Sequence, residues 1–543
     1  MRLQGNNYNS RCLAHLLCAC SPFFVLASPL PAAAPAIYET LPPSRTGITF
    51  SHQSGLTERR RLPESIAPGV AIFDYNGDGL MDLYFVNSAG PGALYRNDGN
   101  LHFTNVTAAA GVPGRDFGLG VTTCDYNSDG APDLFITSYG RNTLYRNNRN
   151  GTFTDVTREA GLELPGLWTA AVFFDFDNDG HPDLFLGHFV DYDPATEPAC
   201  RYGDRYHYCH PLSFKPHPSK LYRNQGDGTF SDVSVSSGIA AHPGKVFGAV
   251  STDVNNDGLL DLFVANDSVP NFLFINRGHG KFDEVGLDAG VAYSADGNPR
   301  SGMGVDATDF NGDGLIDLFV ANFNRERFSL YRNLGALHFT DDAGPTGLGS
   351  ATQMYSGWGA RFFDFDLDGD DDLVLANSHP DDQIGKLSTT LTFREPLLLF
   401  RNEGAKFSLL GPEAGPAFIQ NWPARGLAVG DLDNDGYPDI VIANTGEAPL
   451  ILHHTGQGAG NWLGLDPGPA PAGAIVRWAI GDKVRTKFLQ AGGSYLSAHD
   501  PRVILGLGPA TQATWVEVQW PGGRKTRLTQ PAARSYYKVV PPQ

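Results

Sequence analysis

The sequence has little of what marks the common enzymes and membrane proteins. Its 543 residues include only four methionines and six cysteines. After the N-terminal segment, no run reaches the ~18 apolar residues that a membrane-spanning helix needs. Long stretches of helical periodicity are also absent, which favours an all-β protein. No nucleophile elbow, HExxH pair, Walker loop or dinucleotide fingerprint occurs, so no catalytic residues are predicted and an enzyme is not favoured.

One acidic pattern is repeated instead. The residues that begin at Asp74 follow D-x-[DN]-x-D-G-x-x-D-[LI], and six further copies follow it. Crowded carboxylates repel one another unless a hard cation with several oxygen ligands lies between them. Positions 1, 3, 5 and 9 offer side-chain oxygens, position 7 offers a backbone carbonyl, and the glycine at position 6 permits the sharp turn. Each of these loops, numbered one to seven along the chain, is therefore a predicted calcium site.

The predicted ligands of the seven loops are Asp74, Asn76, Asp78, Leu80, Asp82; Asp125, Asn127, Asp129, Ala131, Asp133; Asp175, Asp177, Asp179, His181, Asp183; Asp253, Asn255, Asp257, Leu259, Asp261; Asp309, Asn311, Asp313, Leu315, Asp317; Asp364, Asp366, Asp368, Asp370, Asp372; and Asp431, Asp433, Asp435, Tyr437, Asp439.

The loops differ from EF-hand loops in their surroundings. An EF-hand carries a glutamate at its last position and lies between two helices, whereas these loops end on an aspartate. Residues 70–73 before the first loop and 83–86 after it are typical of strands. Each loop is therefore expected to join two antiparallel strands. Asparagine at position 3 predicts weaker sites in loops one, two, four and five than in the other three.

Metal chelation accounts for most of the acidity. The formal charge is −19, but 24 aspartates occupy the side-chain ligand positions, and without them the charge would be +5. Seven divalent ions would bring it to −5. The charge is also uneven, because residues 461–543 hold ten Lys and Arg against four Asp and Glu. This asymmetry predicts a separate C-terminal module.

The first residues have the features of an export signal. Arg2 and Arg11 accompany an apolar stretch, and Val25-Leu-Ala27 fits a cleavage site. We predict a signal peptide at 1–27, a linker at 28–46 and a secreted, extracellular or periplasmic protein. Calcium outside the cell is abundant enough to fill weak sites. The alternative is a lipoprotein signal that anchors the protein to the cell surface through Cys20.

Residues 47–456 are predicted to form a seven-bladed β-propeller. Each repeat has an apolar strand, the acidic loop, a second strand, a third strand such as Leu94-Tyr-Arg-Asn97 and a fourth with an aromatic residue, and four strands make one blade. The seventh repeat lacks its fourth strand, so we expect Ile48-Thr-Phe50 to complete it and close the ring. The predicted fourth-strand aromatics are Phe50, Phe103, Phe153, Phe230, Phe282, Phe339 and Phe407.

Strand alternation places the acidic loops on one face and the connections between second and third strands on the other. Two of those connections are long, 191–219 in blade three and 378–396 in blade six. Long insertions on a rigid scaffold commonly bind ligands. The candidate residues of this ligand face are His188, Asp191, Asp193, Asp267, His379 and Asp381.

Cys200 and Cys209 lie nine residues apart in the first insertion. In an exported protein a local disulfide is the simpler interpretation. The alternative is a transition-metal site completed by His207 and His210, which matches no standard zinc spacing. Cys124 lies on an apolar strand and is predicted to be a buried thiol.

Residues 461–543 lack the acidic loop. Alternation over residues 515–520 predicts a half-buried strand with Val516, Val518 and Trp520 inward, and glycine pairs mark turns. We expect a small β-sandwich-like domain.

The acidic loops resemble the FG-GAP/VCBS repeats of integrin α-chain propellers and bacterial surface proteins. In the tail, Asn461-Trp-Leu-Gly-Leu, Gln490-Ala-Gly-Gly-Ser-Tyr-Leu-Ser-Ala and Val518-Gln-Trp-Pro-Gly-Gly resemble the ASPIC/UnbV domain, with Ile475 where that domain usually has arginine. Together they are similar to bacterial relatives of the cartilage acidic protein family. The resemblance implies an extracellular calcium-binding protein, and some members belong to enediyne biosynthetic clusters.

Two functions follow. In the first, structural calcium ions tie the hairpin turns, and the exported propeller binds or adheres to an extracellular protein or glycan, with no nucleic-acid partner and no transmembrane segment. The basic tail is then expected to bind anionic glycans or to dock on its own propeller. The alternative is an enzyme or accessory protein of polysaccharide or secondary-metabolite metabolism, with His and Asp of the insertions in acid–base roles.

Overall fold

A computed structural model describes residues 36–542 except 405 and 469–471. The predicted signal peptide at 1–27, the lipid-anchor candidate Cys20 and the first part of the predicted linker lie outside the described residues.

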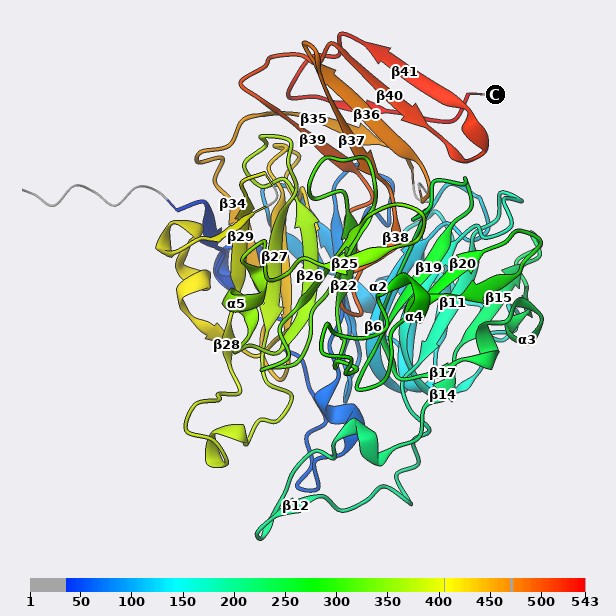
Figure 1. The fold of residues 1–543 in the computed structure, drawn as a ribbon, viewed down its shortest axis with the longest axis vertical. Helices are drawn as coiled ribbons and strands as arrows, with labels where there is room; N and C mark the ends of the chain where they lie inside the picture. The colour runs from blue at the N-terminus through cyan, green and yellow to red at the C-terminus, as the bar shows by residue number, and fades with distance from the viewer. Residues whose placement is uncertain (1–35, 405, 469–471, 543) are drawn as a thin grey trace, which may run out of the picture. The chain divides into compact units, whose positions relative to one another are not determined.

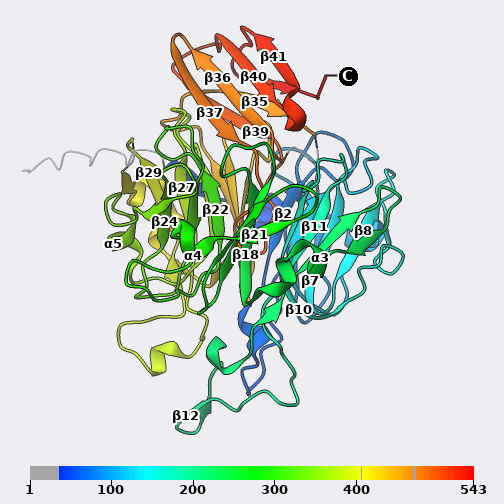
Figure 2. The ribbon, with the colours of Figure 1, turned by 45° about the vertical axis from the view of Figure 1, so that its right-hand side comes forward.

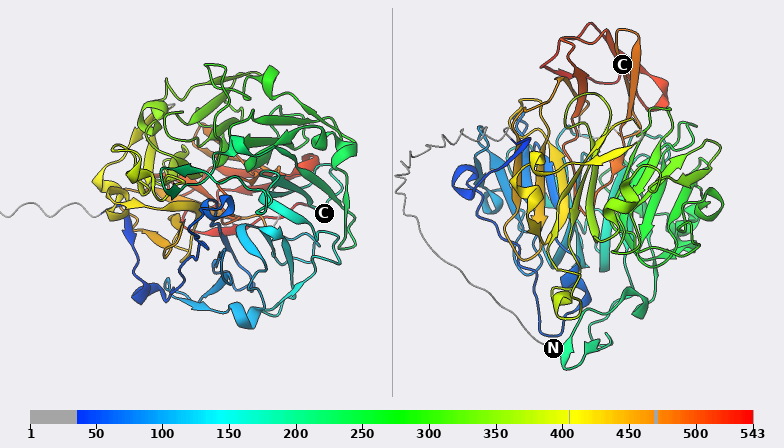
Figure 3. Two further views of the ribbon diagram at one scale, coloured as in Figure 1. Left: turned by 90° about the horizontal axis from the view of Figure 1, so that it is seen from below. Right: turned by 60° about the vertical axis from the view of Figure 1, so that its left-hand side comes forward.

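Antiparallel strands pair in seven units of four, and each unit contains one acidic loop between its first and second strands. The first strands of the units contact one another in cyclic order, from β2 through β6, β10, β18, β22, β26 and β32 back to β2. The units therefore stand around a common axis, and the chain colours run around the ring in Figure 3. The predicted all-β propeller is confirmed.

The strands, unit by unit, are β2 (Val70–Phe73), β3 (Asp82–Phe85), β4 (Ala93–Asn97), β5 (Phe103–Asn105); β6 (Phe117–Cys124), β7 (Asp133–Arg141), β8 (Thr143–Asn147), β9 (Phe153–Asp155); β10 (Pro165–Phe174), β11 (Asp183–His188), β15 (Lys220–Asn224), β16 (Phe230–Asp232); β18 (Val246–Thr252), β19 (Asp261–Asn266), β20 (Phe272–Asn276), β21 (Phe282–Glu284); β22 (Val305–Thr308), β23 (Asp317–Val320), β24 (Ser329–Asn333), β25 (Phe339–Asp341); β26 (Gly357–Phe363), β27 (Asp372–Asn377), β29 (Leu398–Asn402), β30 (Phe407–Leu409); and β32 (Ala424–Gly430), β33 (Asp439–Asn444), β34 (Leu450–His454) with β1 (Tyr38–Thr40).

Short elements connect these strands. The helical turns are α1 (Pro43–Thr46), α2 (Thr107–Ala110), α3 (Ser234–Ser237), α4 (Gly286–Ala289) and α5 (Leu348–Thr352), with 3-10 turns η1 (Leu62–Ser65), η2 (Pro211–Ser213), η3 (Ile239–Ala241), η4 (Ile384–Lys386), η5 (Pro412–Ala414) and η6 (Pro416–Ile419). Three further two-stranded sheets lie in the connections between these strands: β12 (Arg201–Tyr202) with β13 (Arg205–Tyr206), β14 (His217–Pro218) with β17 (Pro243–Gly244), and β28 (Glu395–Pro396) with β31 (Asn421–Trp422).

The N-terminal segment does close the last unit, but through a different strand from the one predicted. β1 pairs with β34 in register Tyr38↔His454, so part of the segment predicted as a linker is propeller. Tyr38 is buried, and its hydroxyl donates to the Pro438 carbonyl at 3.1 Å. Phe50 lies outside any strand and stacks on Phe85 at 5.3 Å. The expectation for Ile48–Phe50 was therefore wrong, because aromatic burial alone does not distinguish strand pairing from packing over a neighbouring blade.

Apolar side chains pack between adjacent units. One cluster joins Ile72 and Leu83 of the first unit to Val441 and Ile451 of the last, so the hydrophobic core is continuous across the closure. The fourth-strand phenylalanines other than Phe50 are all buried. These side chains hold each unit against the next.

The tail, residues 461–543, folds into two packed sheets. One contains β35 (Asn461–Asp466), β39 (Val503–Gly508) and β42 (Tyr536–Lys538), and the other β36 (Ile475–Ile480), β37 (Lys483–Phe488), β40 (Trp515–Gln519) and β41 (Lys525–Thr529), with the 3-10 turn η7 (Pro521–Gly523). Val516, Val518 and Trp520 are buried between them, as the alternation predicts. In Figures 1 and 2 these sheets lie above the blades.

Between the two tail sheets, one segment leaves the sandwich and enters the propeller. This axial segment, residues 490–500, contains β38 (Ala491–Gly492), which pairs with β18. Farther along, Ser494 pairs with Val305 of β22 and Ala498 with Ala71 of β2. Tyr495 is buried, packs on Trp358 at 4.8 Å and donates its hydroxyl to the Ile66 carbonyl at 3.1 Å. The axis of the ring is therefore filled by the tail.

Glycines make room for the axial segment. A Cβ at Gly69 would overlap the Leu496 carbonyl, and one at Gly430 would lie 2.6 Å from the Asp500 Cβ. These two glycines, one just before β2 and one at the end of β32, thus have a packing reason, since the axial segment passes close to them.

Candidate metal centres

Each acidic loop is shaped by its first aspartate. In loop one, Asp74 Oδ1 accepts from the Gly77 amide and Oδ2 from the Gly79 amide, both at 2.8 Å. Gly79 has φ 85°, a left-handed conformation that favours glycine. The bond from the position-6 amide to the first carboxylate recurs in all seven loops. The backbone therefore points the side-chain oxygens inward before any ion binds.

The last aspartate of each loop connects it to the third strand. Asp82 accepts from the Asn97 amide at 2.8 Å and from the Tyr75 amide at 2.9 Å. The Asn97 side chain in turn donates to the Leu432 carbonyl of the neighbouring blade at 2.7 Å. Sequence reasoning missed this role, although the signal was present as the asparagine that ends each Tyr-Arg-Asn strand. Equivalent bonds to a neighbouring blade are made by Asn147, Asn224, Asn276, Asn333 and Asn402.

Burial makes these loops unfavourable for bare carboxylates. It raises the pKa of the position-9 aspartate to about 8 in loops one to five, that is, in Asp82, Asp133, Asp183, Asp261 and Asp317. Burial also raises the pKa of Asp372 well above its ordinary value and raises that of Asp439. A cation beside these groups would favour their ionised form.

The residue at position 3 divides the loops. In loop one, the Asn76 amide donates to Asp78 Oδ2 at 2.8 Å. In loops three and six, the position-3 aspartate pairs with an arginine of the third strand, Asp177 with Arg223 at 2.6 Å and Asp366 with Arg401 at 2.9 Å. The additional negative charge of those loops is therefore partly balanced, which narrows the expected difference in metal affinity.

Loop seven carries a histidine where other blades have arginine or isoleucine. His453 Nδ1 lies 3.0 Å from Asp439 Oδ1 and 4.0 Å from Asp433 Oδ2. Although burial opposes its charge, the bond to Asp439 and that carboxylate's charge raise the pKa of His453. His453 thus lies beside the last aspartate of loop seven, whereas the arginines of loops three and six pair with the aspartate at position 3.

The residues fit a divalent ion. Ligand atoms of Asp175, Asp177 and Asp183 lie within 4.8 Å of one another, as do those of Asp364, Asp366 and Asp372 and of Asp431, Asp433 and Asp439. Hard oxygen donors in this number suit calcium. When bound, the ion would supply positive charge between carboxylates that otherwise repel one another.

The tail covers loops six and seven. Lys487 pairs with Asp371 at 2.6 Å and Arg485 with Asp370 at 2.8 Å. The Tyr536 hydroxyl donates to Asp431 Oδ2 at 2.6 Å, so a tail side chain bonds to the first predicted ligand of loop seven.

On the face opposite the acidic loops, most of the residues predicted to bind an external ligand are buried against other residues of the protein. His188 lies between Trp168 and His217, with ring centroids 4.4 and 3.9 Å away, and burial lowers its pKa to about 3. His379, Asp267 and Asp381 are also buried. Asp191 and Asp193 are exposed.

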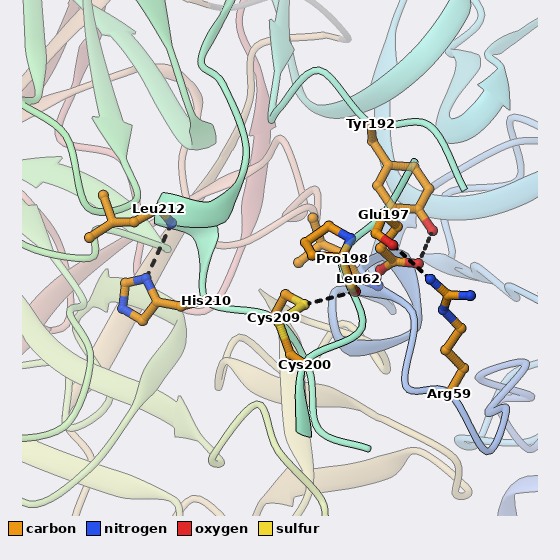
Figure 4. The surroundings of a disulfide bond; sticks show 9 residues. All are labelled: Arg59, Leu62, Tyr192, Glu197, Pro198, Cys200, Cys209, His210 and Leu212. Carbon is orange, nitrogen blue, oxygen red and sulfur yellow. Dashed lines mark hydrogen bonds between the residues drawn. A yellow bond between two sulfur atoms is a disulfide. The ribbon is translucent and has the colours of Figure 1, made fainter. Parts of the chain in front are cut away.

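The two insertions meet each other and residues 57–66, and together these three segments form what we call the cap. His207 Nδ1 lies 2.6 Å from Asp381 Oδ2, which joins the two insertions. Arg60 forms two bonds of 2.9 Å to Asp382. Figure 4 shows Glu197, which accepts from the Leu62 amide at 2.9 Å.

Cys200 and Cys209 form a disulfide in the cap, with Cα atoms 5.3 Å apart (Figure 4). The transition-metal alternative does not fit, because both sulfurs are used and His210 Nδ1 accepts from the Leu212 amide at 3.2 Å. Cys124 is free and buried.

In the part of the chain that the structure describes, no helix has the length and apolar character needed to cross a membrane.

Comparisons with known proteins agree with this architecture. The FG-GAP-like repeat family matches residues 74–136, 125–186, 212–264, 253–320 and 309–375, an FG-GAP repeat matches 424–461, and the ASPIC and UnbV family matches 466–543. Cartilage acidic protein 1 of Homo sapiens is 28% identical over 326 residues, which cover 58% of this chain and 46% of that protein. The Xenopus tropicalis protein is 29% identical over 318 residues, 55% of this chain and 45% of its own length. The chain thus matches about half the length of these relatives.

Solved structures that align with this chain include BBS1N in complex with ARL6DN, at 11% identity and TM-score 0.43 over 78% of this chain and 99% of the other. YCF48 bound to D1 peptide shows 10% identity and TM-score 0.41 over 79% and 100%. The repeats, the acidic loops and the tail together assign the chain to the FG-GAP repeat family, with an ASPIC and UnbV domain at its C-terminal end.

Proposed function

We propose that this chain is an exported calcium-binding propeller that acts as an extracellular binding module. The observation that carries the proposal is the buried aspartate at position 9, which recurs with the same backbone contacts in each of the seven loops. An ion that binds only the folded loop stabilises the fold. At a free calcium concentration about 100 times the dissociation constant, each filled site would contribute about 2.7 kcal/mol.

Two features support a binding role over a purely structural one. The cap presents exposed residues on one face, and the basic tail lies beside the acidic loops on the other. Ion pairs and the axial segment tie the tail to the propeller, and ion pairs join the three segments of the cap to one another. A rigid scaffold with irregular segments at both faces is the usual arrangement of a recognition protein.

The test is calcium titration by calorimetry with thermal unfolding in calcium and in EDTA. We expect about seven ions and a melting temperature that falls markedly in EDTA. Asp257→Asn in loop four is expected to remove one ion, whereas the control Asp288→Asn, on the exposed part of α4, leaves the number unchanged. One or two ions, or an equal melting temperature in EDTA, would contradict the proposal.

A further inference from the structure

A large cleft lies between the tail and the open acidic loops. Its volume is about 1530 Å³, larger than the ~300–1,000 Å³ of typical small-molecule pockets. Asp74, Asp125 and Asp175, the first residues of loops one, two and three, line one side, and Arg524, Tyr536 and Lys538 of the tail line another. Loop seven borders the cleft through Asp431.

The basic residues of the cleft fall into two groups. Lys487, Arg361 and Arg502 have carboxylate partners in Asp371, Asp306 and Asp500. Arg149, Arg524 and Lys538 also line the cleft and are exposed, and none forms an ion pair with a described residue. Arg149 comes from the connection between β8 and β9, on the loop side of the propeller. Arg524 donates one hydrogen bond, to the Pro542 carbonyl at 3.1 Å. Three cations from two domains therefore lack a described carboxylate partner and can bind an anion.

The acidic residues of the cleft are mostly committed to metal loops. Five of the seven that line it, Asp74, Asp125, Asp175, Asp364 and Asp431, are first residues of those loops. Asp500 is paired with Arg502, and Asp466 Oδ1 accepts from the Gly468 amide. A divalent ion in each of loops one to three would add two positive charges per loop, six in all, to the floor of the cleft, so the charge of the cleft would depend on metal.

Loops one to three also leave room for a ligand at the metal. Each offers five ligand positions, whereas calcium takes about six to eight oxygens. A Cβ at Gly79, Gly130 or Gly180 would meet nothing within 4 Å, so each turn faces open space at its position-6 glycine. Water or an oxygen of a bound molecule could therefore reach an ion held in these loops.

We propose that this cleft binds an acidic oligosaccharide in a calcium-dependent manner. Carboxylate and hydroxyl oxygens of the sugar complete the coordination of calcium in loops one to three, and Arg149, Arg524 and Lys538 bind its remaining anionic groups. Glycine and Asx turns of loops one to three line the cleft together with aromatic residues such as Trp520, a combination that suits the hydroxyls and the apolar faces of sugar rings. The inference rests on the proposed calcium binding and adds the ligand class and the surface.

The experiment is binding of the mature full-length chain, with calcium and with EDTA, to three hexasaccharides of stated chemistry. An oligogalacturonate carries carboxylates, a heparin fragment carries sulfates as well, and cellohexaose is neutral. We expect the uronate chain to bind in calcium, at least tenfold weaker binding in EDTA, and none to cellohexaose. A preference for the heparin fragment would assign recognition to the arginines and lysine more than to calcium coordination.

The key variant combines Arg149→Glu, Arg524→Glu and Lys538→Glu, and it is expected to weaken binding at least tenfold. The matched control, Arg205→Glu with Lys215→Glu and Lys406→Glu, changes the net charge equally outside the cleft and should stay within twofold. Equal losses in both variants, or equal binding of a short DNA duplex, would overturn the inference in favour of general polyanion attraction. Calcium binding without any saccharide binding would also overturn it while leaving the proposed function intact.

Discussion

Loops six and seven have the same sequence pattern as loops one to five but different surroundings. At the position-6 glycine of loops one to five a side chain would meet open space, whereas at Gly369 it would overlap Arg485 and at Gly436 it would overlap Trp462. Asp431 is fully buried, and its partner Tyr536 belongs to the tail. One motif thus serves as a surface turn in five blades and as part of a domain interface in two.

Metal removal should affect the covered loops and the open loops in the same way, and it has the largest expected effect. The position-9 aspartates are buried in covered and open loops alike, and in loops one to five burial raises their pKa to about 8. The folded state then holds protons that the unfolded chain releases near its ordinary value of 3.8, so stability falls as pH rises between these values. In EDTA we expect the melting temperature at pH 5 to exceed that at pH 8 by at least about 5 °C. Saturating calcium should flatten or reverse this dependence, and a melting temperature in EDTA that rises with pH would contradict the burial of these groups.

Two matched glycine substitutions isolate the effect of the tail. Gly436→Ala and Gly79→Ala place a Cβ at nearly the same backbone angle, φ 83° and 85°. Both incur about 1 kcal/mol for the left-handed conformation, but only Gly436→Ala forces a side chain into Trp462. We expect it to cost about 2 kcal/mol more than its partner in chemical denaturation. Equal losses of unfolding free energy in the two variants would mean that Trp462 moves aside without strain.

Ion pairs between tail and propeller sharpen the comparison further. Lys487 and Asp371 have side chains 18% and 14% exposed, whereas Lys525 pairs with Glu517 from a side chain that is 51% exposed. Lys487→Met is expected to lower the unfolding free energy by about 2 kcal/mol, because it strands a largely buried carboxylate. The control Lys525→Met should cost about 0.5 kcal/mol or less. A small effect of Lys487→Met would show that tail docking does not depend on this pair.

The smallest expected effect concerns a single hydroxyl. Tyr536→Phe removes the bond to Asp431 and is expected to cost about 1 kcal/mol in metal-free protein. The control is Tyr537→Phe, whose hydroxyl donates to the Ala532 carbonyl and accepts from the Ala532 amide. Both bonds are exposed, so water replaces them and the substitution should be nearly neutral. If calcium binds in loop seven, the cost of Tyr536→Phe should change with calcium while that of the control does not.

The local parts of this molecule were predictable because ten consecutive residues determine a loop. The spacing of Asp74, Gly79 and Asp82 was sufficient for the turn, its two strands and the candidate ligands. Features that depend on contacts between residues far apart in the sequence were not predictable in this way. Tyr38 and Phe50 are both aromatic residues near the N-terminus, and only pairing with β34 shows which one closes the ring.

Contacts between distant residues also determine the cap and the axial segment, and the sequence did not predict them. His207 and Asp381 looked like ligand or catalytic candidates, but they bond to each other across 174 positions of the chain. The glycine-rich segment after Gln490 was visible as part of a family resemblance, whereas its place inside the ring depends on Gly69 and Gly430 making room for it. The sequence identifies such residues one by one, but only the folded structure shows which of them contact each other.

The filled axis has a consequence for the order in which the protein can be completed. Tyr38 of the first strand bonds to Pro438, 400 positions later, and the axial segment follows only after that partner has been made. During synthesis the first strand must therefore wait for almost the whole chain, and contacts of such separation are slow to form. The segment that fills the centre is among the last to arrive. Completion of the propeller is thereby linked to completion of the domain that follows it.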